Sequence, residues 1–145
     1  MSLLEKLLIL SVFAQVVLTI GILLLMGRER VPKVMSGEIK IRNIAVERDA
    51  YPLRARLLSN NFDNQFQLPV LFYVAALLAL WAGGVGWVDV LLSLAFVFTR
   101  YVHAAFHVTN NNVLQRFSAY TCGLLLLAAL WVWLMLRIFL FNPAL

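Results

Sequence analysis

Four mainly apolar stretches of helix-spanning length set the strongest constraint on how this chain folds. They cover about residues 3–26, 52–82, 86–108 and 113–141. An α-helix needs about 20 residues to cross the ~30 Å hydrocarbon core of a bilayer. Hydrophobic residues make up 63% of the 145 residues and charged residues 13%, whereas a soluble domain has about 45–50% and about 25%. The sequence therefore predicts an integral membrane protein.

The apolar stretches are continuous, without the alternation that marks the strands of a membrane barrel. Helices are the natural structure for them, because a backbone in lipid must satisfy its own hydrogen bonds. We predict an all-α fold, a four-helix bundle forming a single membrane domain over residues 1–145. Its helices should cover about 3–26, 52–82, 86–108 and 113–141, and residues 27–51 should form a basic loop.

The distribution of charge predicts the orientation. Eight of the twelve Lys and Arg residues lie between Arg28 and Arg56, against four acidic residues. By the positive-inside rule this loop and the 108–112 turn are cytoplasmic, and both termini and the 82–86 turn lie outside. Arg137 is an exception, for which we expect snorkelling to the interface. We expect no nucleic-acid binding, because the basic residues are not interleaved with stacking aromatics.

A polar stripe enters the second apolar stretch. Arg56, Asn60, Asp63 and Gln67 fall at i, i+4, i+7 and i+11 on one helical face, with Asn64 beside them. Polar groups at membrane depth are costly unless they face a bundle interior or a wet cavity, so we predict that this face points inward. Pro69 should kink the helix.

The third and fourth stretches carry similar stripes. Arg100, His103 and His107 are spaced i, i+3 and i+7, and Arg116 and Tyr120 are spaced i and i+4. Polar side chains at such positions often only hydrogen-bond across helices. Three helices nevertheless offer polar residues at one end of the bundle.

Three arginines, Arg56, Arg100 and Arg116, would then converge on one anion-binding pocket. Arginine suits this role because its planar fork binds carboxylates bidentately and keeps its charge. Unpaired arginines repel one another, and Asp63 supplies only one negative charge.

Two other chemistries are less favoured. His103 and His107 have the spacing of metal ligands, but no Cys or carboxylate lies nearby in the sequence, so we expect no metal. The single cysteine, Cys122, is interpreted as a small buried residue rather than a nucleophile.

The whole chain resembles the MAPEG family, the membrane-associated proteins of eicosanoid and glutathione metabolism, and specifically a bacterial member. The family's second helix carries an R-x-x-x-N-x-x-E pattern followed by a proline. Arg56, Asn60 and Asp63 fit this spacing, with aspartate in place of glutamate, and Pro69 follows slightly late. A shifted alignment, Asn61 with Asn64 or Gln65, keeps nearly the same face.

The later helices resemble the prostaglandin E synthase branch of that family. Arg100, His103, Arg116 and Tyr120 stand at matching spacing, and His107 replaces the branch's tyrosine. The resemblance implies a homotrimer that binds glutathione as co-substrate in a cytoplasm-facing cleft between subunits. It assigns Arg116 and Tyr120 to catalysis near the sulfur, and assigns glutathione binding to Arg56, Asn60, Asp63, Asn64, Arg100, His103 and His107.

Two functions remain open at this point. One is a glutathione transferase or peroxidase that forms the thiolate and directs it at a hydrophobic small-molecule substrate in the lipid. The other is a non-catalytic lipid-binding or scaffold protein, because the family also includes the five-lipoxygenase activating protein. A small transporter has little support, since no pair of helices is broken by Gly and Pro. We expect a bacterial inner membrane as the location.

Overall fold

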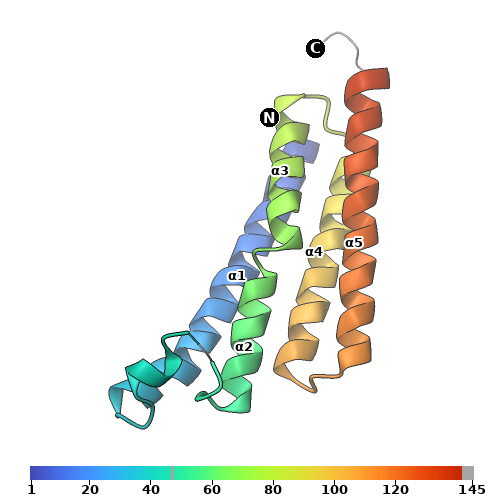
Figure 1. The fold of residues 1–145 in the computed structure, drawn as a ribbon. Helices are drawn as coiled ribbons and strands as arrows, with labels where there is room; N and C mark the ends of the chain where they lie inside the picture. The colour runs from blue at the N-terminus through green and yellow to red at the C-terminus, as the bar shows by residue number, and fades with distance from the viewer. Residues whose placement is uncertain (47, 142–145) are drawn as a thin grey trace.

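The computed structural model describes residues 1–46 and 48–141, and in these residues it contains helices and no strand (Figure 1). Four stretches are long and apolar enough to cross a membrane, which confirms the predicted all-α fold and number of spans. Large apolar side chains such as Phe13, Leu77 and Leu125 are exposed along these spans, which fits helices in an apolar environment. The helices are α1 (Leu3–Met35), α2 (Leu53–Asn64), α3 (Leu68–Trp81), α4 (Trp87–Val108) and α5 (Val113–Leu136), with a short 3₁₀ helix, η1 (Ile41–Ile44), and a π-helical end, η2 (Arg137–Phe141).

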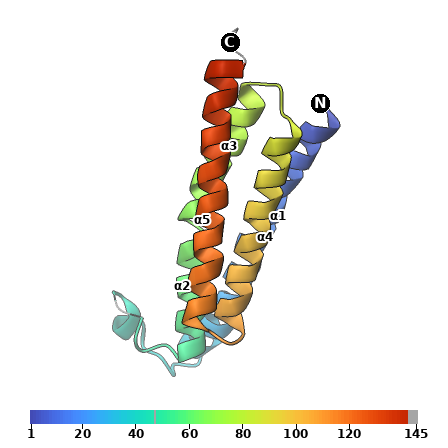
Figure 2. The same ribbon diagram turned by 90° about the vertical axis from the view of Figure 1, so that its right-hand side faces the viewer.

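Two views of the ribbon show how the connections divide between the ends of the bundle (Figures 1 and 2). The N-terminus, the 82–86 turn and the end of η2 lie at one end. The turn between α4 and α5 and the segment around η1 lie at the other, which we call the basic end because residues 28–56 belong to it. This is the relative arrangement that the sequence predicts.

Helix α1 is longer than predicted. It begins with a capping box, in which the Ser2 hydroxyl accepts from the backbone N–H of Glu5 and the Glu5 carboxylate accepts from that of Ser2. Its 33 residues span about 50 Å at ~1.5 Å per residue, about 20 Å more than the hydrocarbon core. The helix therefore continues past residue 26 to Met35, and part of the expected loop is helical.

The predicted second helix is two helices. α2 ends at Asn64, Gln67 leaves helical geometry (φ −99°, ψ −103°), and α3 resumes with Pro69 in its first turn. A proline there loses no hydrogen bond, whereas inside a continuous helix its ring would clash with the carbonyl four residues earlier, that of Gln65. Pro69 thus starts a new helix instead of kinking a continuous one, and the offset is visible in Figure 1.

The apolar core packs α3, α4 and α5 closely. The Phe72 and Phe96 rings lie 5.0 Å apart between α3 and α4. Gly123 of α5 sits against α4 so closely that an added Cβ would lie 2.7 Å from the Thr99 hydroxyl oxygen. The main buried apolar cluster among the described residues consists of Leu8, Leu68, Phe72, Ala75, Ala76, Ala79, Val85, Val90, Phe96, Val97, Leu127, Leu130 and Leu134.

Arg137 reaches the turn between α3 and α4 at one end of the bundle. Its guanidinium is buried, donates to the carbonyl oxygens of Gly83 and Ala79, and lies 3.4 Å from a carboxylate oxygen of Asp89. The other Asp89 oxygen accepts from the Gly86 N–H. A buried pair is tolerated when further hydrogen bonds satisfy it, so Arg137 ties the end of α5 to the α3–α4 turn.

The contact at Gly123 gives a stability prediction. Gly123→Ala should destabilise the protein by about 1–3 kcal/mol, because Thr99 is stiff at χ1 and must yield. Thermal unfolding in detergent measures the loss. Gly21→Ala is the control, since nothing lies within 4 Å of its added Cβ. The double variant with Thr99→Ala should recover part of the loss, and no recovery would contradict a clash with Thr99.

Candidate functional site

The polar stripe predicted for the third helix lies on one buried face of α4. Arg100, His103 and His107 are 0%, 4% and 1% exposed. The two imidazole rings stand 5.0 Å apart between centroids. The i, i+3, i+7 spacing therefore identified a real inward-facing polar surface.

Helix α5 adds two residues to this surface. The His103 Nδ1 lies 3.0 Å from the backbone carbonyl oxygen of Arg116, a hydrogen bond when Nδ1 carries the proton. The Tyr120 ring centroid is 5.8 Å from the His103 ring and 5.8 Å from the Arg100 guanidinium carbon. The α4–α5 cluster, as we name it, consists of Arg100, His103, His107, Arg116 and Tyr120.

Arg100 hydrogen-bonds to the C-terminal end of α2. Its Nη2 donates to the backbone carbonyl oxygen of Asn64 over 3.1 Å. Asn64 is the last residue of α2, where carbonyls have no helical partner and the helix dipole is negative. The break between α2 and α3 thus supplies a partial negative charge to a buried arginine.

A buried amide network fixes this break, and the sequence reasoning missed it. The Gln15 side chain on α1 donates to Gln65 (3.0 Å), Gln65 donates to the side chain of Asn61 (3.2 Å), and Asn61 donates to the Ala104 carbonyl on α4 (3.3 Å). The signal was present in Gln15, the one amide within the apolar stretch of the first helix. The network joins α1, α2 and α4 beside Arg100.

The polar stripe predicted for α2 does not face the interior of this chain. Asn60, Asp63 and Gln67 are exposed, whereas the buried face of α2 carries Asn61 and, just beyond its end, Gln65. The predicted inward orientation is therefore wrong within one chain. Equal spacing identifies residues that share a face but does not say where the face points.

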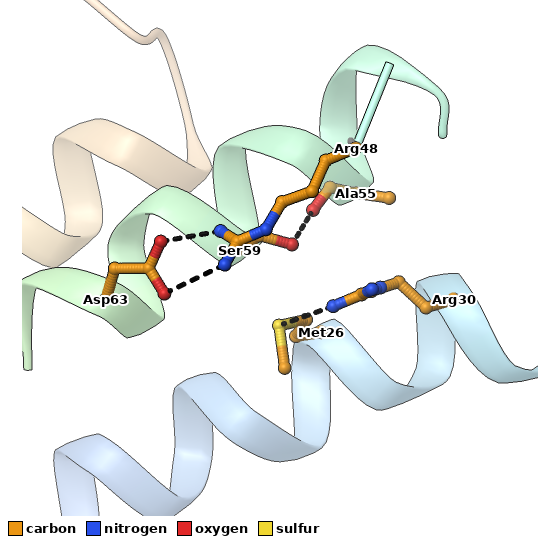
Figure 3. A network of polar contacts seen from close by, with 6 residues as sticks. All are labelled: Met26, Arg30, Arg48, Ala55, Ser59 and Asp63. Carbon is orange, nitrogen blue, oxygen red and sulfur yellow. Dashed lines mark hydrogen bonds and ion pairs between the residues drawn. The ribbon is translucent and has the colours of Figure 1, made fainter. Parts of the chain in front are cut away.

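The charged members of that stripe pair with the preceding loop. Arg48 donates to both carboxylate oxygens of Asp63, at 2.5 and 3.4 Å, and its side chain lies along α2 toward Asp63 (Figure 3). This hydrogen-bonded carboxylate raises the pKa of the Arg48 guanidinium. Arg56 donates to Asp49 over 3.2 Å. A cavity of about 380 Å³ lies between loop and helix, lined by Val46, Arg48, Asp49, Leu53, Arg56, Leu57 and Asn60.

The predicted residues therefore form two groups in one chain. Arg56, Asn60 and Asp63 make the α2 surface group, and no described contact joins them to the α4–α5 cluster. Asn64 connects the two through its backbone carbonyl. The predicted convergence of all three arginines does not occur within a single chain.

The α4–α5 cluster is cationic and incompletely satisfied. Within the described residues, Nε and Nη1 of Arg100, Nε2 of His103, both ring nitrogens of His107 and Nε of Arg116 are buried and have no hydrogen-bond partner. The Arg116 guanidinium donates to the Asn111 side chain, and neither cluster arginine forms an ion pair in that part of the chain. Buried donors without partners are costly. Their chemistry suits an anionic ligand with several acceptor atoms.

Two further predictions concern a metal site and Cys122. The described residues contain no group of three or more His, Cys, Asp or Glu side chains placed to hold a metal ion. Cys122 is exposed on α5, so its interpretation as a buried residue is wrong. It faces away from the bundle because Gly123, the next residue, occupies the contact with α4.

The fold and the charged interior together define the class of protein. Four apolar helical spans make this a multi-pass integral membrane protein, with a buried cationic cluster between two of its helices. Residues 8–136 match the MAPEG family, so the chain belongs to that family. No curated protein and no solved structure matches the chain.

The amide network beside the cluster can be tested by a double-mutant cycle. Gln15→Leu and Gln65→Leu should each destabilise the protein, and the pair should be coupled by about 0.6 kcal/mol, a usual value for hydrogen bonds between membrane helices. Unfolding in mixed micelles with denaturing detergent measures each free energy. Gln67→Leu in place of Gln65→Leu is the matched control and should show no coupling to Gln15, because Gln67 is exposed. Equal coupling in both cycles would contradict the network.

Proposed function

We propose that this protein is a glutathione-dependent membrane enzyme that attacks lipophilic electrophiles or peroxides with the glutathione thiolate. Membership of the MAPEG family supports a membrane function related to glutathione or lipid metabolism. The observation that carries the proposal is the α4–α5 cluster, whose buried nitrogens lack partners among the described residues. Glutathione brings carboxylates and an ionisable thiol, which match this cationic surface.

The cluster supports a role in thiolate formation. A free thiol has a pKa of about 8.5, so little of it is ionised at neutral pH. A nearby guanidinium favours the anion, and each unit of lowering corresponds to about 1.4 kcal/mol. We assign Arg116 to stabilising the thiolate and Tyr120 to donating a hydrogen bond to the sulfur. Arg100, His103 and His107 line the same site.

The α2 surface group has the chemistry to bind the charged ends of the tripeptide. Arg56 suits a carboxylate, Asp63 suits the amino group, and the amides of Asn60 and Asn64 suit peptide groups. These side chains lie apart from the cluster within one chain, so we propose that the α2 group of one subunit meets the cluster of the next in a homotrimer. The exposed polar face of α2 supports this, because such a face is costly in lipid.

The apolar surroundings suit a substrate that arrives through the bilayer. The thiolate attacks such an electrophile or peroxide, and the membrane concentrates both the enzyme and the apolar reactant. We place the protein in a bacterial inner membrane, with the basic end in the cytoplasm and both termini outside, following the distribution of Lys and Arg.

One observation favours the second candidate, a non-catalytic lipid-binding or scaffold protein. Asp63 and Arg56 already form ion pairs with Arg48 and Asp49. Both pairs are solvent-exposed, and such pairs contribute only about 0–1 kcal/mol, which a bound tripeptide readily replaces. The enzyme remains the better-supported proposal, because these ion pairs provide no partner for the buried nitrogens of the α4–α5 cluster.

Glutathione binding to the purified protein is the direct test. Calorimetry should detect binding, and a thiolate absorbance difference should accompany it. Arg116→Ala should abolish the thiolate signal while leaving binding within about tenfold, a change of about 1.4 kcal/mol. Arg56→Ala should weaken binding itself. Arg42→Ala, an exposed arginine of η1, is the matched control and should change neither.

The outcomes separate the candidates. Binding without a thiolate signal in the wild type would favour the non-catalytic candidate. No binding at millimolar glutathione would overturn the glutathione proposal. Binding with a thiolate signal would justify a search among lipophilic electrophiles.

Mixed oligomers test the shared site. Arg56→Ala and Arg116→Ala subunits, each with a different affinity tag, are co-expressed and the mixed species isolated. If the site lies between subunits, a mixed trimer regains an intact site, with Arg56 from one chain and Arg116 from the other. Thiolate formation should therefore return in mixed oligomers and in neither homo-oligomer. Failure to return would overturn the site shared between subunits and leave Arg56 outside the site of the cluster, without affecting the glutathione proposal.

A further inference from the structure

A second polar cavity lies at the basic end of the bundle, between α1, α2 and α4. Its volume is about 240 Å³, and no residue of the α4–α5 cluster or the α2 surface group lines it. Six residues form its walls: Leu25, Arg28, Glu29, Arg54, Leu58 and Val108. The glutathione proposal makes no use of this cavity.

The cavity has an apolar half and a charged half. Leu25, Leu58 and Val108 come from three different helices and form the apolar walls. Arg28 follows the apolar stretch of α1, which ends near residue 26, by one helical turn or less. The cavity therefore crosses the level at which hydrocarbon gives way to headgroups, as a site for an amphiphile must.

The charged half has an excess of positive charge. Arg54 lies 3.0 Å from Glu29, measured from Nε to a carboxylate oxygen, so the pair neutralises itself. The pair uses only the Nε side of a guanidinium fork, and the Arg54 side chain is 66% exposed. Arg28 is exposed and forms no ion pair within residues 1–46 and 48–141. One unpaired positive charge and an open guanidinium edge thus face the same cavity.

We propose that this cavity binds the phosphate of an anionic phospholipid headgroup. Arg28 supplies the neutralising charge, and the free edge of Arg54, oriented by Glu29, supplies hydrogen bonds in the forked geometry that phosphate oxygens accept. The acyl chains leave along the apolar walls at Leu25 and Val108. Eight basic residues against four acidic ones between Arg28 and Arg56 attract anionic lipid to this end of the bundle.

Lipid retention measured by native mass spectrometry tests the proposal. The full chain is reconstituted into bilayers of phosphatidylglycerol and phosphatidylcholine in equal amounts, released gently, and its bound lipids are counted. The wild type should retain phosphatidylglycerol preferentially. Arg28→Gln with Arg54→Gln should reduce the preference by about fivefold for each arginine.

The control removes the same charge elsewhere at the basic end. Lys40→Gln with Arg42→Gln changes two exposed residues outside the cavity and should keep the preference. Equal loss in both double variants would mean that diffuse charge attracts the lipid, and would overturn a defined site.

Two further outcomes also decide against the proposal. If inorganic phosphate or glycerol phosphate displaces phosphatidylglycerol at equal concentration, the ligand is a soluble anion and not a lipid. If the Arg28/Arg54 double variant changes the number of subunits while lipid retention stays the same, the cavity is a contact between copies of the chain. Selective loss of phosphatidylglycerol at unchanged stoichiometry supports the lipid site.

Discussion

The interruption of the second membrane span, between Asn64 and Leu68, determines the interior of this bundle. An unbroken helix would use the Asn64 carbonyl in its own hydrogen bonding, and Arg100 would lose the one protein acceptor described for it. Hydrogen bonds lost at the interruption are partly replaced, because the Gln65 side chain turns inward and bonds to Gln15 and Asn61. A buried arginine in a membrane protein is costly. Here the end of a helix, rather than an acidic side chain, makes it tolerable.

The two buried arginines of the bundle show how differently its ends are built. Arg137 has Asp89 and two carbonyl oxygens as partners, so its charge is paired within the chain although its Nε has no partner among the described residues. Arg100 has one carbonyl partner, and it lies in a cluster with His103, His107 and Arg116. One buried arginine thus has a carboxylate partner, whereas the other has none among the described residues. This contrast favours a ligand at the α4–α5 cluster over a purely structural role.

The length of the apolar stretches predicted the four spans, because each span must cross the same hydrocarbon thickness. The polar stripe on α4 was predictable because Arg100, His103 and His107 share one face of the helix. The orientation of α2 was not predictable in this way. That helix carries Asn60 and Asp63 on one side and Asn61 on another, so polar residues alone do not identify its buried side. Packing against α1 decides it, through Gln15. The partner of Arg137 was missed because Asp89 is 48 residues away and no local pattern links them.

The separation of the α2 surface group from the cluster has a consequence for the whole molecule. A polar surface made of Asn60 and Asp63 on α2, with Gln67 beyond its end, is stable next to water, headgroups or protein, but not next to acyl chains. The pair between Arg48 and Asp63 lowers this cost without covering Asn60 or Gln67. In the proposed trimer a second copy of the chain would cover them and would bring Arg56 opposite the α4–α5 cluster, with the anionic ligand between them. Assembly of subunits and ligand binding would then both contribute partners to these polar groups. We therefore expect ligand binding to stabilise the assembly, and assembly to increase ligand affinity.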